Sequence, residues 1–143
     1  TIGHIDIINR GLPLFDKMII GIGVNSQKKY LFPLEKRISW LQKIFEFEQK
    51  IEVQSYTGLT VNFCETHLAR YILRGIRSSG DFEFERAVSQ TNRVLSRNIE
   101  TIFILANPSL ASVSSSIVRD VIMNGGDPSP FIPEEIENLV QRK

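Results

Sequence analysis

Four short stretches of the sequence contain side chains of the types that bind phosphate. They are His4, Lys28, the pair Arg74 and Arg77, and the serine run 114–116. Guanidinium groups bind phosphate oxygens in pairs, whereas a lysine ammonium acts as a mobile point charge. A helix N-terminus adds unpaired backbone N–H groups and the positive end of its dipole. We find no general base among these residues, which favours phosphoryl or nucleotidyl transfer, where positioning and charge stabilisation supply most of the catalysis.

Each stretch taken singly also has an ordinary structural explanation. His4 fits a surface residue close to an N-cap at Thr1, and Lys28 fits a solvated basic loop. The two arginines fit ordinary surface residues, and the serine run fits a helix cap. The common position of the stretches favours the phosphate interpretation, because every one follows a predicted strand or begins a predicted helix. In an open α/β sheet such positions lie along the edge where ligands bind.

The pattern of apolar residues predicts alternating strands and helices. Apolar runs of strand length occupy 17–24, 51–56, 70–76 and 101–107. Helical patterns occupy 4–11, 34–46, 59–69, 79–96, the segment after the serine run and the segment after Pro133. The strands are continuous apolar runs, as expected when both faces of a sheet are covered. The sequence therefore predicts an α/β fold: a Rossmann-like, doubly wound parallel sheet in a single domain that spans residues 1–143.

The composition limits the classes of protein to which the chain can belong. Its 143 residues fit one domain, and 42% apolar and 23% charged residues are ordinary for a globular protein. A net charge of +1 gives no reason to expect a nucleic acid or an anionic membrane as partner. Two histidines and one cysteine, far apart, predict no metal held by protein ligands alone. The lone cysteine, with no leader and no apolar run of membrane length, predicts a cytoplasmic protein.

Four segments of the sequence resemble bacterial phosphopantetheine adenylyltransferases in their order and separation. They are TIGHIDIINRG, KKYLFPLEKRI, LRGIRSSGDFEFERAVSQTNR and VSSSIVRD, and the resemblance covers essentially the whole chain. The third and fourth segments are specific to this family, whereas Thr-x-Gly-His alone marks the wider nucleotidyltransferase superfamily. The resemblance implies adenylyl transfer from ATP to 4′-phosphopantetheine, the penultimate step of coenzyme A synthesis, with Mg²⁺ as cofactor. The products are dephospho-coenzyme A and pyrophosphate, and the nucleophile is an ionised phosphate that needs no base.

The resemblance also implies roles for individual residues. The implied catalytic residues are His4, which stabilises charge on the α-phosphate, and Lys28, which holds the attacking phosphate. The implied ATP-binding residues are His4, Gly75, Arg77, Glu85, Val113, Ser114, Ser115 and Ser116. The implied phosphopantetheine-binding residues are Lys28, Leu59, Thr60, Arg74 and Asn92. Thr60 stands where methionine is common in the family, and the family implies a homohexamer with coenzyme A as a feedback ligand.

One part of the family pattern is missing from the sequence. Members have a first strand that ends in a Pro-Gly-[Ser/Thr]-Phe-Asp-Pro loop just before Thr-x-Gly-His, whereas this sequence begins at Thr1. That strand would be central in the sheet. We therefore expect a sheet without its central strand, in which two neighbouring strands each lack a ladder partner. We also expect the natural protein to have an N-terminal piece that this sequence omits.

Two alternatives to this function are open at the level of the sequence. One is a related nucleotidyltransferase with another phosphate acceptor, such as nicotinamide mononucleotide or glycerol phosphate, although LRGIRSSGDFEFE favours phosphopantetheine. The other is a non-catalytic module that binds nucleotide or coenzyme A, because the cations are present while the hydroxyl-bearing loop is absent. An RNA-binding relative of class I synthetases is disfavoured, since the charge is near neutral and no aromatic or basic stripe is found.

Overall fold

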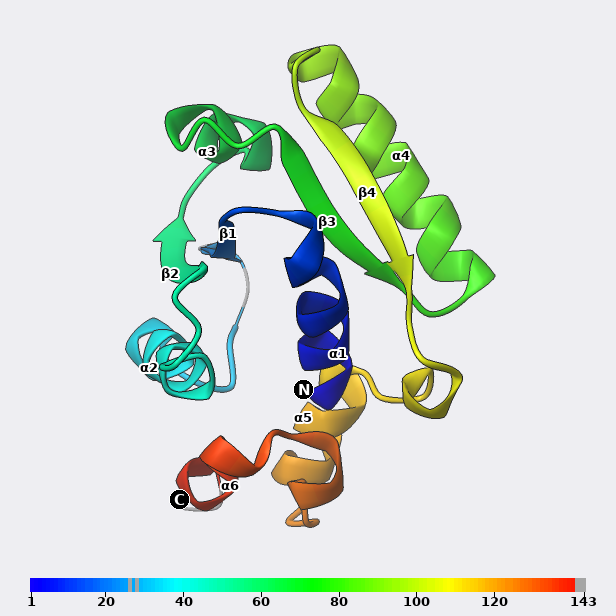
Figure 1. Cartoon of the computed structure of the whole chain (residues 1–143). Coiled ribbons are helices and arrows are strands. Elements are labelled where there is room, and N and C mark those ends of the chain that lie inside the picture. The colour runs from blue at the N-terminus through cyan, green and yellow to red at the C-terminus, as the bar shows by residue number, and fades with distance from the viewer. Residues whose placement is uncertain (26, 28, 141–143) are drawn as a thin grey trace.

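Strands and helices alternate along the chain in the computed structural model, which describes residues 1–25, 27 and 29–140 (Figure 1). The strands are β1 (Met18–Gly23), β2 (Ile51–Tyr56), β3 (Tyr71–Ile76) and β4 (Glu100–Leu105). The helices are α1 (Ile2–Gly11), α2 (Leu34–Ile44), α3 (Thr60–Thr66), α4 (Ser79–Leu95), α5 (Ser115–Met123) and α6 (Glu134–Val140), and short 3-10 turns lie at 12–14, 108–110 and 129–131. The predicted alternation is confirmed. The fourth strand ends earlier than predicted, because Asn107 already caps the turn that begins at Pro108.

The strands pair in parallel, as predicted, but they form two separate sheets. In the first, β1 pairs with β2 from Met18↔Ile51 to Gly23↔Tyr56. In the second, β3 pairs with β4 from Tyr71↔Glu100 to Ile76↔Leu105. No ladder joins β1 to β3 within the described residues, so each of these strands has one edge without a strand partner there. Two strands that each lack a ladder partner were expected from the sequence, and β1 and β3 have this arrangement in the described residues.

Helices cover both sheets and bring helix ends close to the carboxyl ends of the strands. Helix α1 contacts β3 and β4, and α4 contacts the same two strands (Figure 1). Gly75 in β3 permits the close approach of α1, because a Cβ at this position would lie 2.8 Å from Cγ1 of Ile7. Helix α2 contacts β2 and α6. The N-terminus of α1 therefore lies beside the second sheet, close to where β3 ends.

A cluster of buried residues near the C-terminus links the two halves of the molecule. It consists of Val113, Val118, Ile132, Ile136 and Val140. Phe32 and Trp40, from the α2 region, pack against this cluster, with their rings edge-to-face at 4.7 Å between centroids. Burying one aliphatic side chain of this kind contributes about 1.5–3 kcal/mol. Helices α5 and α6 therefore join the α2 side to the segment that follows β4.

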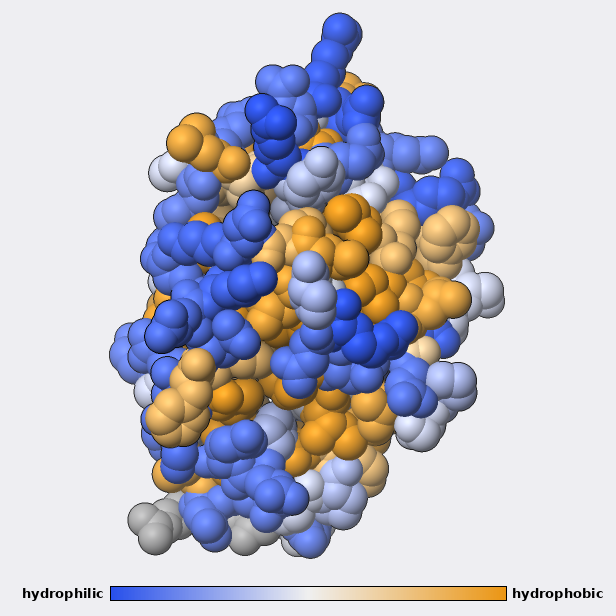
Figure 2. All heavy atoms as spheres, in the orientation of Figure 1, coloured by the Kyte–Doolittle hydropathy of each residue, from blue (hydrophilic) through white to orange (hydrophobic). Residues whose placement is uncertain are grey.

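Apolar side chains also reach the surface. Figure 2 shows them gathered along the middle of the face seen in Figure 1, with hydrophilic side chains around them. Phe84 is 67% exposed on α4, Leu105 is 70% exposed at the end of β4, and Ile117 is 50% exposed on α5. None of the helices in the described part of the chain has the length and apolar character needed to span a bilayer.

Candidate active site

A cavity of about 640 Å³ lies between the two sheets and brings most of the predicted site residues together. Those that line it are His4, Thr60, Arg74, Gly75, Arg77, Glu85, Val113, Ser114, Ser115 and Ser116. Leu59 and Asn92 are not among the described residues that line it, and Leu59 is 51% exposed. Lys28 lies outside the described residues. The cavity therefore unites residues from α1, β3, α3, α4 and the start of α5.

The imidazole of His4 is held in one tautomer by the first turn of α1. Its Nδ1 lies 3.4 Å from the backbone nitrogen of Thr1 and 3.0 Å from Thr1 Oγ1. In the capping box of α1 the Thr1 nitrogen donates to the His4 side chain, so Nδ1 accepts, and a neutral ring then has its proton on Nε2. In the structure this cap leaves the Nε2–H of His4 available to an anion in the cavity.

The charge state of His4 follows from its surroundings. The pKa of His4 is lowered to about 4, chiefly by desolvation of the ring, although the residue as a whole is exposed along the cavity. The positive charges of the N-terminal amine, Arg77 and Arg74 lower the pKa further. At neutral pH the ring is therefore uncharged. It acts on an anion as a hydrogen-bond donor and not as a cation.

Arg74, in β3, is paired with Glu85 of α4. Arg74 Nε donates to Glu85 Oε2 at 2.9 Å, and Nη2 donates to Oε1 at 2.5 Å. The glutamate side chain is 12% exposed and the arginine side chain 49% exposed. The pKa of Arg74 is raised, chiefly because its guanidinium donates hydrogen bonds to Glu85. This two-point contact sets the plane of the guanidinium and leaves its Nη1 outside the pair.

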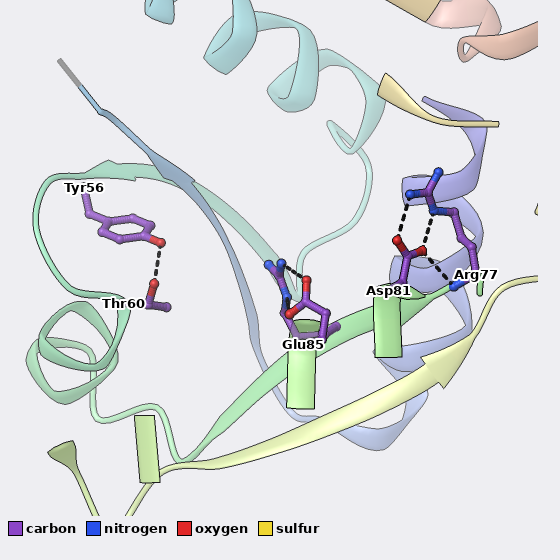
Figure 3. Close-up of polar contacts among 6 residues, drawn as sticks. Tyr56, Thr60, Arg77, Asp81 and Glu85 are labelled. Carbon is purple, nitrogen blue, oxygen red and sulfur yellow. Dashed lines mark hydrogen bonds and ion pairs between the residues drawn. The ribbon is translucent and has the colours of Figure 1, made fainter. Parts of the chain in front are cut away.

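Arg77 has a second carboxylate partner, Asp81, at the start of α4 (Figure 3). Arg77 Nε donates to Asp81 Oδ2 at 2.9 Å, and Nη2 donates to Oδ1 at 3.2 Å. Oδ2 also accepts from the backbone N–H of Arg77, while Ser78 Oγ accepts from the backbone N–H of Asp81. Asp81 was not predicted as a site residue, although an acid three positions after a serine cap is a recognisable sequence signal.

The serine run begins α5, as predicted, and its members have different partners. Ser114 is the N-cap, because its Oγ accepts from the backbone N–H of Ile117 at 3.1 Å. Ser116 Oγ accepts from Arg119 Nη2 at 3.3 Å, and the carbonyl of Ser115 accepts from Arg119 Nε at 3.2 Å. The capping explanation therefore holds for Ser114. The remaining N–H groups of this helix start face a cavity that also contains two arginines, which suits an anion.

The wall on the side of the first sheet has no charge at its centre. Tyr56, at the end of β2, stacks on Phe63 of α3 with 4.5 Å between ring centroids and 15° between planes. Its hydroxyl lies 2.8 Å from Thr60 Oγ1, as Figure 3 shows. His67 continues this aromatic wall, 4.5 Å from Phe63. Sequence reasoning found Thr60 but missed Tyr56 and Phe63, because their roles arise from contacts between elements.

Comparison with known proteins assigns the chain to a family. Residues 1–121 match the model of the cytidylyltransferase-like family. The chain is 54% identical, over 136 residues, to the phosphopantetheine adenylyltransferase of Flavobacterium psychrophilum, which covers 95% of this chain and 89% of that protein. The proteins of that name from Flavobacterium johnsoniae and Crocosphaera subtropica are 48% and 40% identical, with 95% of this chain and 89% and 87% of theirs covered. This chain belongs to the phosphopantetheine adenylyltransferase family.

Family membership confirms the resemblance that the sequence motifs predicted, and it confirms that the chain is a nucleotidyltransferase. The individual residue roles stay predictions. The carboxylates of the cavity, Asp81 and Glu85, are both engaged with arginines. No group of three histidine, cysteine, aspartate or glutamate side chains suited to a metal occurs in the described ranges.

Proposed function

We propose that this chain transfers the adenylyl group of ATP to 4′-phosphopantetheine, with dephospho-coenzyme A and pyrophosphate as products. Three relatives that are 40–54% identical have the name phosphopantetheine adenylyltransferase. The observation on which the proposal rests most is the convergence of His4, Arg74, Arg77 and the N-terminus of α5 on one cavity. A cluster of this kind suits a site in which two phosphorylated substrates bind side by side and react.

The proposed chemistry needs charge stabilisation more than proton transfer. An oxygen of the acceptor phosphate attacks the α-phosphorus of ATP, and the bond from that phosphorus to the oxygen shared with the β-phosphate breaks. The electron pair leaves with pyrophosphate. Since the attacking phosphate is ionised at neutral pH, no general base is required. Neutral His4 donates its Nε2–H to the α-phosphate as charge develops there, and Lys28 holds the attacking phosphate.

In this proposal the two arginines bind the phosphates of different substrates. Arg77, together with Ser115 and Ser116, binds the β- and γ-phosphates, and Arg74 binds the phosphate of the acceptor. Each guanidinium uses Nε and Nη2 for its carboxylate partner, so each presents Nη1 to a ligand. Fixing a guanidinium before the ligand arrives lowers the ordering cost of binding.

The remaining assignments concern the ends of the two substrates. Val113 flanks the adenine, and Glu85 with the backbone of Gly75 lies in the adenylate region. Leu59, Thr60 and Asn92 contact the pantetheine arm. The contact with Thr60 is supported by its place on the uncharged wall of the cavity. Leu59 is exposed, so its contact requires the arm to extend out of the cavity.

We also propose Mg²⁺ as cofactor, bound through the phosphates of ATP, since the described side chains form no cage for it. Coenzyme A, which contains the pantetheine arm, is proposed as a feedback ligand of the same cavity. A homohexamer is supported by exposed apolar side chains such as Phe84 and Leu105. A cytoplasmic location is supported by the single cysteine, Cys64, which is unpaired.

Pyrophosphate release tests the proposal and separates it from its alternatives. The full-length protein is given ATP, Mg²⁺ and one acceptor at a time: 4′-phosphopantetheine, nicotinamide mononucleotide or glycerol phosphate. We expect release with phosphopantetheine alone. Release with another acceptor would make the chain a related nucleotidyltransferase. Calorimetric binding of ATP without release from any acceptor would make it a non-catalytic module.

A further inference from the structure

A charged pair on α1, Asp6 and Arg10, contacts the chain at the point where it leaves β4. The two side chains form an ion pair, with 3.1 Å between Arg10 Nη1 and Asp6 Oδ2. Arg10 Nη1 also donates to the backbone carbonyl of Leu105 at 2.7 Å. Asp6 Oδ2 also accepts from the backbone N–H of Asn107 at 3.4 Å. The pair therefore holds backbone groups that lie 95 and 101 residues further along the chain.

These contacts come just after the last rung of the second sheet. The backbone N–H of Ala106 still donates to the carbonyl of Ile76 at 2.8 Å. One residue later, the N–H of Asn107 donates to Asp6 instead of to a strand. Asp6 is suited to this contact, because its side chain is only 17% exposed and an ionised carboxylate is a strong acceptor. Asp6 thus accepts the first backbone N–H that follows the last hydrogen bond of the β3–β4 ladder.

The segment held in this way leads directly to the serine run. Asn107 caps the 3-10 turn 108–110, because its Oδ1 accepts from the backbone N–H and the hydroxyl of Ser109. The segment then returns to α1 at Val113, whose carbonyl oxygen would lie 3.6 Å from a Cβ at Gly3. Segment 106–114 therefore contacts α1 at both of its ends, close to the turn that contains His4.

We propose that Asp6 and Arg10 are positioning residues that fix segment 106–114 on α1 and so set the separation between His4 and the N-terminus of α5. In the proposed function these two features bind neighbouring phosphates of one ATP molecule, and the inference rests on that function. Neither Asp6 nor Arg10 lines the cavity among the described residues, so the pair acts through the segment and not on the ligand. A changed separation between these two features weakens the binding of ATP and leaves the binding of the acceptor phosphate unchanged.

The experiment compares Asp6→Asn and Arg10→Met with the unchanged chain. Asp6→Asn keeps the size of the side chain and removes its charge, and Arg10→Met keeps the aliphatic stem. We expect each variant to lower kcat/KM for ATP about tenfold, below the ~100-fold loss that a misplacement of about 1 Å in a reacting group causes. KM for 4′-phosphopantetheine should change little. The conservative variants Asp6→Glu and Arg10→Lys should recover part of the loss.

A matched ion pair elsewhere provides the control. Arg86 and Glu83 form an exposed pair on α4, 2.7 Å apart, three residues from each other in sequence. Glu83→Gln and Arg86→Met should leave both KM values unchanged. Amide hydrogen exchange should become faster across 106–114 in the Asp6 and Arg10 variants and stay unchanged in the controls.

Two results would overturn the proposal. One is a lower melting temperature of the Asp6 and Arg10 variants with unchanged exchange in 106–114 and unchanged affinity for ATP, which would make the pair merely stabilising. The other is an equal loss toward both substrates. Calorimetric titration with ATP alone separates this proposal from the proposed function. If the unchanged chain binds ATP but releases no pyrophosphate, the function fails, while weaker ATP binding by the variants still supports the positioning role.

Discussion

The two walls of the cavity differ in chemistry although both follow strand–helix junctions. The wall from α1, β3 and α4 presents His4, Arg74 and Arg77, and its two arginines have fixed carboxylate partners. The wall from β2 and α3 presents Tyr56, Thr60 and Phe63, which are uncharged. A site that binds both a polyphosphate and an acceptor with a long neutral arm needs a charged wall and an uncharged wall. Under the proposed function, substrate recognition is divided between the two sheets.

The largest effect should come from His4, at the centre of the charged wall. His4→Ala should lower kcat by about 10²–10³, or about 2.7–4 kcal/mol of barrier, because a donor to developing negative charge is lost. KM values should change much less, since the contact strengthens in the transition state. Steady-state pyrophosphate release measures both parameters. His67→Ala, which changes a histidine on the uncharged wall, should lower kcat far less. An equal loss of kcat in the two variants would contradict the distinction between the walls.

The two arginines should separate the two substrates. Arg77→Met should raise KM for ATP and Arg74→Met should raise KM for 4′-phosphopantetheine, each by about 10–100-fold, because a charge-assisted hydrogen bond contributes about 1.5–3 kcal/mol. Arg→Lys at each position should recover part of the loss. Initial rates with each substrate varied in turn give the two KM values. A loss shared equally between substrates in both variants would contradict the proposed division of phosphates.

A smaller effect is expected on the uncharged wall. Tyr56→Phe and Thr60→Val should each raise KM for 4′-phosphopantetheine by about two- to tenfold, because one neutral hydrogen bond contributes about 0.5–1.5 kcal/mol. KM for ATP should not change. The two effects should not add in the double variant, since the two hydroxyls bond to each other. Full additivity, or an effect on ATP, would show that this pair does not act on the acceptor.

The smallest effect at working pH concerns the ionisation of His4. Its pKa of about 4 predicts an NMR titration well below the ordinary histidine range and no change in its charge between pH 6 and 8. The lowered pKa of His4 also makes the folding stability depend on pH. As pH falls from 6.5 toward 4, the unfolded chain takes up a proton that folded His4 does not, so stability decreases in that window. Unfolding of His4→Gln should depend less on pH there, and a midpoint near 6.5 for His4 would refute the assignment.

The charged wall could be found from the sequence because its residues belong to short local motifs. The histidine at a helix start, the two arginines after a strand and the serine run each occupy a position that secondary structure alone places at the edge of the sheet. Asp81 was within reach of the same reasoning, as the third residue after Ser78. Tyr56 and Phe63 were not, because stacking between a strand end and α3 depends on how α3 packs.

Local patterns in the sequence were sufficient for the α/β class, the parallel pairing, the phosphate chemistry and the family. The first three properties follow from hydrophobic periodicity, helix capping and charge, which act over a few residues, whereas the family follows from the resemblance of four sequence segments to its members. The pairing of Arg74 with Glu85, the pKa of His4 and the contact of α1 with Leu105 and Asn107 required the tertiary structure. The physical reason is distance along the chain: which carboxylate meets which cation, and which helix reaches the end of β4, depends on how separate elements pack against one another.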